Sequence, residues 1–360
     1  MKLLDRYIIR KFLVVLFFTT LAFIVIFIIV DLIENLDKFL MYRASLPNVI
    51  IYYIYYIPFI IILTLPVNML LSSLFSIGSM AQYNEIIACQ SAGISLYRIV
   101  APLLMLAFLI SLLSGIAGET VVPKSNRARL DLWRFEIKKE TRHMIRKREQ
   151  IAIQDSDQRQ VFIKVYDGAR KQALQVHIVW TDGNRIVQRW DARKMIWDDQ
   201  RGGWMLQDVT LRQFTEEGEI VQHRDSLAYA HSQIHPDDLK ELELKPEEMN
   251  YTELKRFVDR MLELGADARK WLVDLYMKIS YPFANFIIVL FGAPLASRKR
   301  RSGPALGFAL ALLISFIYFL FLRSGQVLGH KGELSPWLAA WIGNIVFGIG
   351  GILLMLKIRK

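Results

Sequence analysis

The sequence of 360 residues contains a single cysteine, Cys89. One cysteine excludes a disulfide within the chain, so any part of the protein outside the cytoplasm must be stabilised by packing alone. Several enzyme motifs are also missing: there is no GxxxxGK[ST] nucleotide-binding loop, no HExxH, no paired-cysteine metal spacing and no GxSxG nucleophile elbow. The sequence therefore predicts no catalytic residue, no cofactor and no hydrolysis of ATP by a P-loop of its own.

Metal-binding patterns are equally sparse. The six histidines are scattered, and His231 with His235 has the i, i+4 spacing of a helical pair. The following Pro236 argues against a continuous helix that would place both rings on one face. An exposed histidine pair without carboxylate ligands is usually incidental, so we expect no metal site.

Charged side chains are missing from long stretches of the chain. The first of these, Phe12 to Val30, has nineteen uncharged residues, enough to cross a hydrocarbon core of about 30 Å. A cleaved signal peptide has a shorter apolar region and a small-residue cleavage site, so we expect an uncleaved span. Six spans are predicted, over residues 12–30, 44–84, 99–118, 279–297, 302–322 and 334–356.

The net charge of +11 is unevenly distributed. Residues 123–264 hold 26 Lys and Arg against 25 Asp and Glu, whereas the apolar remainder holds 19 against 9. Basic excess beside apolar segments is typical of membrane topology, so a nucleic-acid partner is not expected. One side of the membrane would collect twelve basic residues, including Arg298 to Arg301, and the short loops on the other side four. This count predicts that both termini are cytoplasmic.

Between the third and fourth spans the pattern changes. Residues 151–230 contain short runs rich in Val, Ile and aromatic residues, separated by turn signals such as Asp167-Gly168 and Glu217-Gly218. Short strands with tight turns and no intervening helices favour an antiparallel sandwich or barrel outside the cytoplasm. Such a domain either binds an apolar guest or merely packs its own core. The charged run over 124–150 is either a solvated face or a contact for lipid phosphates.

A mildly polar stretch, MAQYNEIIACQSAGISLYR at 80–98, lies between two apolar ones. As a helix it would have an apolar side, with Gln82 and Glu85 among its polar contacts and Gly93 as a stop. It is either a surface helix that another protein grips or a plain connector. A six-span chain with such a helix suggests a permease driven by a separate ATPase; the alternatives are a membrane enzyme and a membrane-anchored scaffold.

Four stretches resemble the lipopolysaccharide export permease family, LptF/LptG. They are LDRYIIRKF at 4–12, MAQYNEIIACQSAGIS at 80–95, GETVVPKSNR at 118–127 and MKISYPFANFIIVLFGAPLASRKRRSG at 277–303. The LDRY opening is more similar to the LptG member than to LptF, which stays the alternative. The implied fold has six transmembrane helices and a jellyroll-like all-β periplasmic domain. We expect residues 1–122 to form helices 1–3 with a coupling helix at 80–95, residues 123–250 the β domain, and 251–360 a connecting helix and helices 4–6.

The resemblance also implies partners and a location. A second, LptF-like six-span subunit would pair with this chain in the bacterial inner membrane over a cytoplasmic ATPase dimer, which binds the ATP. A single-span LptC-like subunit would assist, and a periplasmic bridge protein would receive lipopolysaccharide from the jellyroll domain.

The resemblance assigns roles to particular residues. Glu85 would present its carboxylate to the ATPase, with Gln82, Ala92 and Gly93 as further coupling residues. Glu34 and Lys38 match polar positions beside the lateral gate, but the acidic Asp31 and Asp37 stand where LptG members can have lysines. The carboxylates over 31–38 otherwise mark only the outer end of the span. Candidate contacts for lipid phosphates are Arg127, Arg129 and Arg134.

The implied jellyroll would hold acyl chains between its sheets. Candidates for this contact are Phe162 and Trp180, with Ile178, Trp190 and Trp204. Their inward or outward direction stays open, because a shift of one residue reverses every face of a strand.

Overall fold

The computed structural model describes most of the chain, and the residues that it describes are 3–139, 147–156, 158–168, 170–182, 185–199, 201–215, 218–229, 232, 234–236, 239, 246–263, 267–297 and 304–357. The chain divides into two compact units: Met1–Leu132 with Arg269–Lys360, and Trp133–Ala268. The expected boundaries were 122/123 and 250/251. The first unit extends beyond residue 122 because helix α5 (Val122–Asp131) packs on α2 (Leu46–Gln82). Helix α8 (Tyr251–Glu263), which was expected with the last three spans, falls within the second unit.

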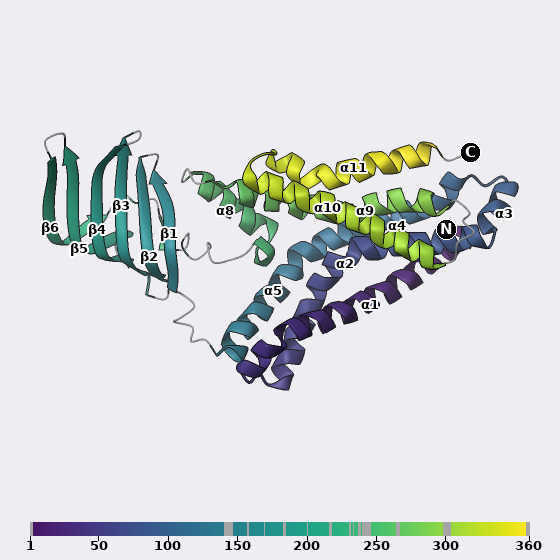
Figure 1. The fold of residues 1–360 in the computed structure, drawn as a ribbon, viewed down its shortest axis with the longest axis horizontal. Coiled ribbons are helices and arrows are strands. Elements are labelled where there is room, and N and C mark those ends of the chain that lie inside the picture. The colour runs from purple at the N-terminus through teal and green to yellow at the C-terminus, as the bar shows by residue number, and fades with distance from the viewer. Residues whose placement is uncertain are drawn as a thin grey trace. The chain divides into compact units, whose positions relative to one another are not determined.

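The first unit is helical (Figure 1). Its described helices are α1 (Leu3–Met41), α2 (Leu46–Gln82), α3 (Glu85–Ser91), α4 (Leu96–Thr120), α5 (Val122–Asp131), α9 (Arg269–Ala296), α10 (Pro304–Lys331) and α11 (Pro336–Leu356). Six helical segments are long and apolar enough to cross a membrane. The six predicted spans are therefore confirmed.

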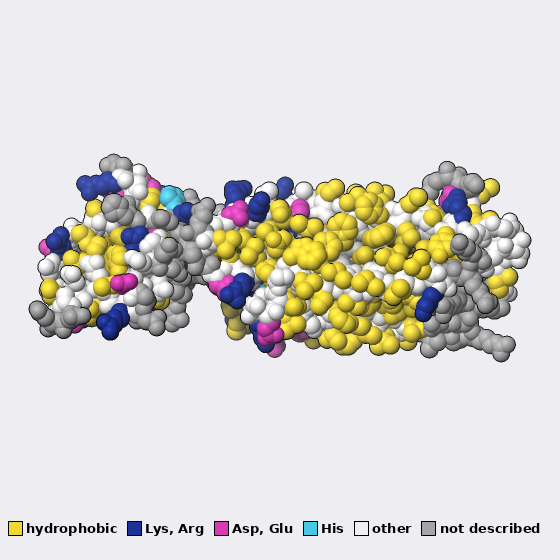
Figure 2. Space-filling model, turned by 90° about the horizontal axis from the view of Figure 1, so that it is seen from above, with side chains coloured by type: hydrophobic (Ala, Val, Ile, Leu, Met, Phe, Trp, Pro, Cys, Tyr) yellow, Lys and Arg dark blue, Asp and Glu magenta, His cyan; other side chains and the backbone are white. Residues whose placement is uncertain are grey.

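The surface of this unit agrees with its composition. Figure 2 shows a broad hydrophobic face on the helical unit, with charged side chains gathered toward its two ends. We call these the α3 end, where α2 ends and α4 begins, and the α5 end, where α1 ends and α2 begins. Tyr97 at the start of α4 donates a hydrogen bond of 2.8 Å to the carbonyl of Met355, so α11 ends at the α3 end.

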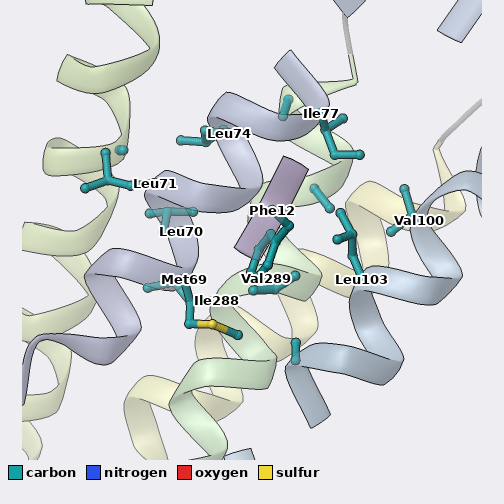
Figure 3. Close-up of a cluster of buried hydrophobic side chains, with 14 of the residues drawn as sticks. Phe12, Met69, Leu70, Leu71, Leu74, Ile77, Val100, Leu103, Ile288 and Val289 are labelled. Atoms are coloured by element: carbon teal, nitrogen blue, oxygen red, sulfur yellow. The ribbon is translucent and has the colours of Figure 1, made fainter. Parts of the chain in front are cut away.

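The core of the helical unit surrounds α2, which is buried continuously from Thr64 to Leu74. Phe12 of α1 packs there among side chains of α2, α4 and α9, including Val289 (Figure 3). Small residues let the helices approach closely, as transmembrane helices commonly do. A Cβ on Gly292 would lie only 2.5 Å from Leu70 Cδ1. A larger residue at position 292 would therefore force the Leu70 side chain to move where α9 crosses α2.

Gly325 is a test of this packing. A Cβ there would lie 2.5 Å from the carbonyl oxygen of Ala339, so Gly325→Ala must push α10 away from α11. We expect a loss of about 1–3 kcal/mol of stability, measured by thermal unfolding in detergent. Gly307→Ala in the same helix, where a Cβ meets nothing within 4 Å, is the matched control and should unfold like the wild type. Equal unfolding of both variants would contradict the close α10–α11 contact.

The second unit contains six described strands: β1 (Lys147–Ser156), β2 (Arg159–Asp167), β3 (Gln172–Asp182), β4 (Arg185–Asp198), β5 (Gly203–Thr215) and β6 (Gly218–Tyr229). They form one antiparallel sheet in the order β1-β2-β3-β4-β5-β6, so consecutive strands are neighbours throughout. The predicted all-β domain between the third and fourth spans is confirmed. A π-helical turn, η1 (Leu132–Ile137), leads into the unit, and η2 (Pro246–Glu248) and α8 (Tyr251–Glu263) follow the sheet.

One face of the sheet carries the core of this unit. Val161, Ile178 and Leu206 are fully buried there. The chain after β6 returns across this face: Trp204 donates its indole hydrogen to the carbonyl of Ile234 at 2.7 Å. Tyr166 of β2 donates to the carbonyl of Pro236 at 3.3 Å. The apolar face is therefore partly covered by the protein's own chain.

Candidate functional site

Helix α3 is shorter than the predicted surface helix over 80–95. Asn84 adopts a left-handed conformation, with φ of 59°, and this separates α2 from α3. At the other end, Gly93 has φ of 80°, and its N–H bonds to the carbonyl of Gln90 at 2.9 Å. The N–H of Ile94 bonds to the carbonyl of Cys89 at 2.9 Å, which completes a Schellman motif. Gly93 thus stops the helix, as its position predicts.

Glu85 begins α3 and contacts α1. Its carboxylate accepts a hydrogen bond of 3.0 Å from the Tyr7 hydroxyl and lies 3.2 Å from Lys11 Nζ. A second ion pair follows α3, between Arg98 at the start of α4 and Asp5 of α1, at 2.8 Å. Sequence reasoning missed Asp5, Tyr7 and Lys11, although all three lie in the LDRYIIRKF stretch. The sequence did contain a signal for them, because Asp5 and Lys11 are charged residues shortly before an apolar span.

The remaining surface of α3 is exposed. Gln82, Ala92 and Gly93, the other predicted coupling residues, all lie on the surface. Two apolar side chains that were not predicted lie among them: Tyr83 is 71% exposed and Ile87 49% exposed. Exposed apolar residues beside polar ones are typical of protein interaction sites. This end of the helical unit therefore offers an amphipathic contact surface.

The α5 end carries a second cluster. The Arg129 guanidinium lies 4.1 Å from the ring centroid of Tyr56 and 5.5 Å from that of Tyr52. Tyr53 on the same helix donates a hydrogen bond of 3.0 Å to Asp31 of α1. Among the residues that the structure describes, Arg129 makes no ion pair. A guanidinium stacked on aromatic rings has a planar set of donors whose geometry matches carboxylate and phosphate groups.

The other predicted phosphate contacts are less concentrated. Glu34 and Lys38 are exposed on α1, and Lys38 donates a hydrogen bond of 2.8 Å to the side-chain oxygen of Asn35. Arg127 lies on α5, half-buried. Arg134 belongs to the second compact unit, whereas Arg129 belongs to the first. Of these residues, Arg129 is the one for which the structure gives contacts to tyrosine rings, those of Tyr52 and Tyr56.

Two of the family-like stretches meet inside the helical unit. Lys278 of α9 lies 3.3 Å from Glu119 at the end of α4, and both side chains are largely buried. About two helical turns further along α9, Asn285 donates a hydrogen bond of 3.0 Å to the hydroxyl of Ser114. These polar contacts join the stretches 118–127 and 277–303 across the α4–α9 interface. Their role is to fix the register of two spans, since interhelical hydrogen bonds link transmembrane helices.

The two predicted acyl-chain contacts in the sheet lie on opposite faces. Trp180 packs against the core cluster, with its ring 4.5 Å from that of Trp190. Phe162 pairs across strands with His177 on the other face and is 39% exposed. That second face is polar: Asp191 is partly buried, which alone would raise its pKa, but hydrogen bonds from His177 and Arg189 hold the pKa below the usual range. Of the predicted acyl-chain contacts, Trp180, Ile178, Trp190 and Trp204 therefore lie on the apolar face, and Phe162 lies on the polar one.

No group of three or more metal-ligating side chains occurs among the described residues. His231 lies outside them. The helical unit therefore has a contact surface at its α3 end and, at its α5 end, Arg129 stacked on the rings of Tyr52 and Tyr56, which we call the tyrosine shelf. The second unit has a sheet with one apolar face.

Comparison with known proteins supports this arrangement. A profile of the family described as lipopolysaccharide export system permease LptF/LptG matches residues 6–357. The chain is 21% identical over 300 residues to LptF of Escherichia coli K12, covering 79% of this chain and 76% of that protein. It is 20% identical over 349 residues to LptG of Haemophilus influenzae, covering 97% of this chain and 92% of that protein. Both paralogues match at nearly equal identity, so the LptG assignment stays a prediction. Since one family profile covers the membrane helices, α3 and the sheet together, the chain belongs to the lipopolysaccharide export permease family LptF/LptG.

Proposed function

We propose that this chain is a permease subunit that moves lipopolysaccharide out of the bacterial inner membrane, using ATP hydrolysed by a separate protein. The observation that carries the proposal is the region of α3: a short helix stopped by Gly93 that exposes Ile87, with Tyr83 exposed just before it at the end of α2. Such a surface is suited to an ATPase groove. The family membership over residues 6–357 supports the substrate.

The distribution of charge supports an orientation. Arg6, Arg10, Lys11, Arg98 and Lys357 all belong to the α3 end. With the positive-inside rule, these residues support an orientation in which this end, both termini and α3 are cytoplasmic and the sheet is periplasmic. The basic residues 298–301, which contribute to the predicted count, lie outside the described residues.

The route of the lipid follows from this orientation. α1 exposes apolar side chains along its middle, including Phe17, Leu21 and Ile29, to lipid or to the second six-span subunit. At the outer end, Arg129 on its tyrosine shelf binds a lipid phosphate. The acyl chains then pass to the apolar face of the sheet beside Trp180. Strands β1 and β6 are the edges of the described sheet, where a periplasmic bridge protein or an LptC-like subunit can add a strand.

The test is to purify the chain gently from its native membrane and identify its companions by mass spectrometry. We expect a cytoplasmic P-loop ATPase, a second six-span protein and bound glycolipid. The ATPase rate of this complex should rise when lipopolysaccharide is added. Isolation of the chain alone, in a preparation where a control membrane complex survives, would overturn the proposal in favour of a scaffold.

A further inference from the structure

Helix α1 is most deeply buried near its two ends, whereas side chains of its middle, such as Leu16 and Phe23, pack only partly against the core. Of the residues that the structure describes in α1, four are buried. Asp5, Ile8 and Phe12 lie near the start of the helix, and Phe39 lies near its end. Ile8 and Phe12 belong to the cluster that also contains Ile86 of α3 and Leu96 of α4. Between Phe12 and Phe39 the helix is half-buried or exposed throughout. Because an α-helix is stiff along its axis, a displacement at the deeply buried end that carries Ile8 and Phe12 would move the rest of α1 with it.

The cytoplasmic anchor contains two polar links that bracket α3. Lys11 and Tyr7 hold Glu85, the first residue of α3, and Asp5 holds Arg98, seven positions beyond Ser91, where α3 ends. The Asp5 side chain is only 12% exposed and that of Arg98 is 39% exposed, so the pair is shielded from water on the Asp5 side. Exposed ion pairs contribute little, but a shielded pair beside buried Ile8 fixes geometry more firmly.

We propose that Asp5, Tyr7 and Lys11 are positioning residues that clamp α1 to both sides of α3, so that these helices move as one body. The inference rests on the proposed function, because α3 must be the element on which the ATPase acts. A displacement of α3 would then shift α1 directly. With 39 residues at 1.5 Å each, α1 extends about 58 Å, and its far end carries Asp31 and Lys38 beside the Arg129 cluster.

The clamp explains two features that the contact surface alone leaves unexplained. Glu85 turns its carboxylate toward α1 although the neighbouring Tyr83 and Ile87 point to solvent. Asp5, an acidic group at the start of an apolar span, is paired across to another helix and not left in water. Both are expected if the link between α1 and the α3 region must survive each transport cycle.

The experiment uses the complete transport complex in proteoliposomes and reports two quantities, ATP hydrolysis and lipopolysaccharide released per ATP. Asp5→Arg and Arg98→Asp are tested singly and together; neither lies on α3. Each single variant should lose about fivefold or more in release per ATP while hydrolysis continues, since a coupling free energy of about 1 kcal/mol or more is removed. The double variant, which restores the pair with its charges exchanged, should recover most of the coupling.

The control is Arg6→Asp, a charge reversal one residue away on the exposed side of α1, which should leave the ratio unchanged. A further arm joins Asp5→Cys to Arg98→Cys with a short bismaleimide in a Cys89→Ser background, and transport should continue after linkage. Single variants with normal coupling, a double variant without recovery, or transport blocked by the linker would each overturn the clamp. Absence of ATP-driven release by the wild type would instead refute the proposed function.

Discussion

Glu85→Lys is expected to abolish ATP-driven lipopolysaccharide release while the protein still folds and inserts. The carboxylate lies at the first position of α3, between the exposed contact surface and the Tyr7–Lys11 link, and the substitution places an ammonium beside Lys11. If Glu85 is a hot spot of the ATPase contact, its loss costs about 2 kcal/mol or more, so release should fall by about thirtyfold or more. The measurement is release of labelled lipid from proteoliposomes that contain the assembled complex.

Two further variants separate the causes of this loss. Glu333→Lys makes the same charge change at an exposed position between α10 and α11 and should transport normally. Lys11→Glu combined with Glu85→Lys restores the internal ion pair but not a carboxylate on α3. We expect this combination to stay inactive, because the ATPase contact needs the negative charge. Full transport by Glu85→Lys itself would contradict the coupling role of Glu85.

Arg129→Ala is expected to weaken lipopolysaccharide binding on the order of tenfold or more, the effect of losing one or two charge-assisted hydrogen bonds. The reason is that the guanidinium lies on the rings of Tyr56 and Tyr52 with no ion pair among the described residues. Arg129→Lys keeps the charge but not the stacking and the planar set of donors, so its affinity should be intermediate. The measurement is binding of labelled lipopolysaccharide to the purified complex.

A matched control for Arg129 lies on the same helix. Lys124→Ala removes a basic charge from the exposed side of α5 and should leave the affinity near that of the wild type. Arg129→Ala with wild-type affinity would remove the tyrosine shelf from the substrate route. Equal losses in both variants would show that only the general positive charge of α5 matters.

Much of the architecture follows from the sequence because burial in lipid is a strong constraint. Uncharged runs such as 12–30 and 99–118 have no other stable location, and turn signals such as Asp167-Gly168 divide the strands at the correct places. Gly93 was also placed correctly, since a helix stop of this kind has a local cause. These features depend on neighbours in the chain.

The parts that the sequence did not predict depend on distant residues. The pairing of Glu85 with Lys11 joins positions 74 apart, and no local pattern identifies which of several basic residues makes it. The faces of Phe162 and Trp180 depend on strand register, which spacing alone leaves ambiguous by one residue. The break at Asn84 was missed because its left-handed conformation is adopted by asparagine only in some contexts. The sequence thus proposes the stretches that could hold a site, while the contacts between distant residues come from the fold.

The most direct test of the central claim is transfer of lipopolysaccharide from proteoliposomes to a soluble acceptor, with the chain, its partner subunit and the ATPase present. We expect transfer only with ATP and a hydrolysis-competent ATPase, and its loss when Glu85 of this chain is replaced by Lys. Transfer at the same rate with an inactive ATPase would contradict the account, since the chain would then move lipid without the contact at α3.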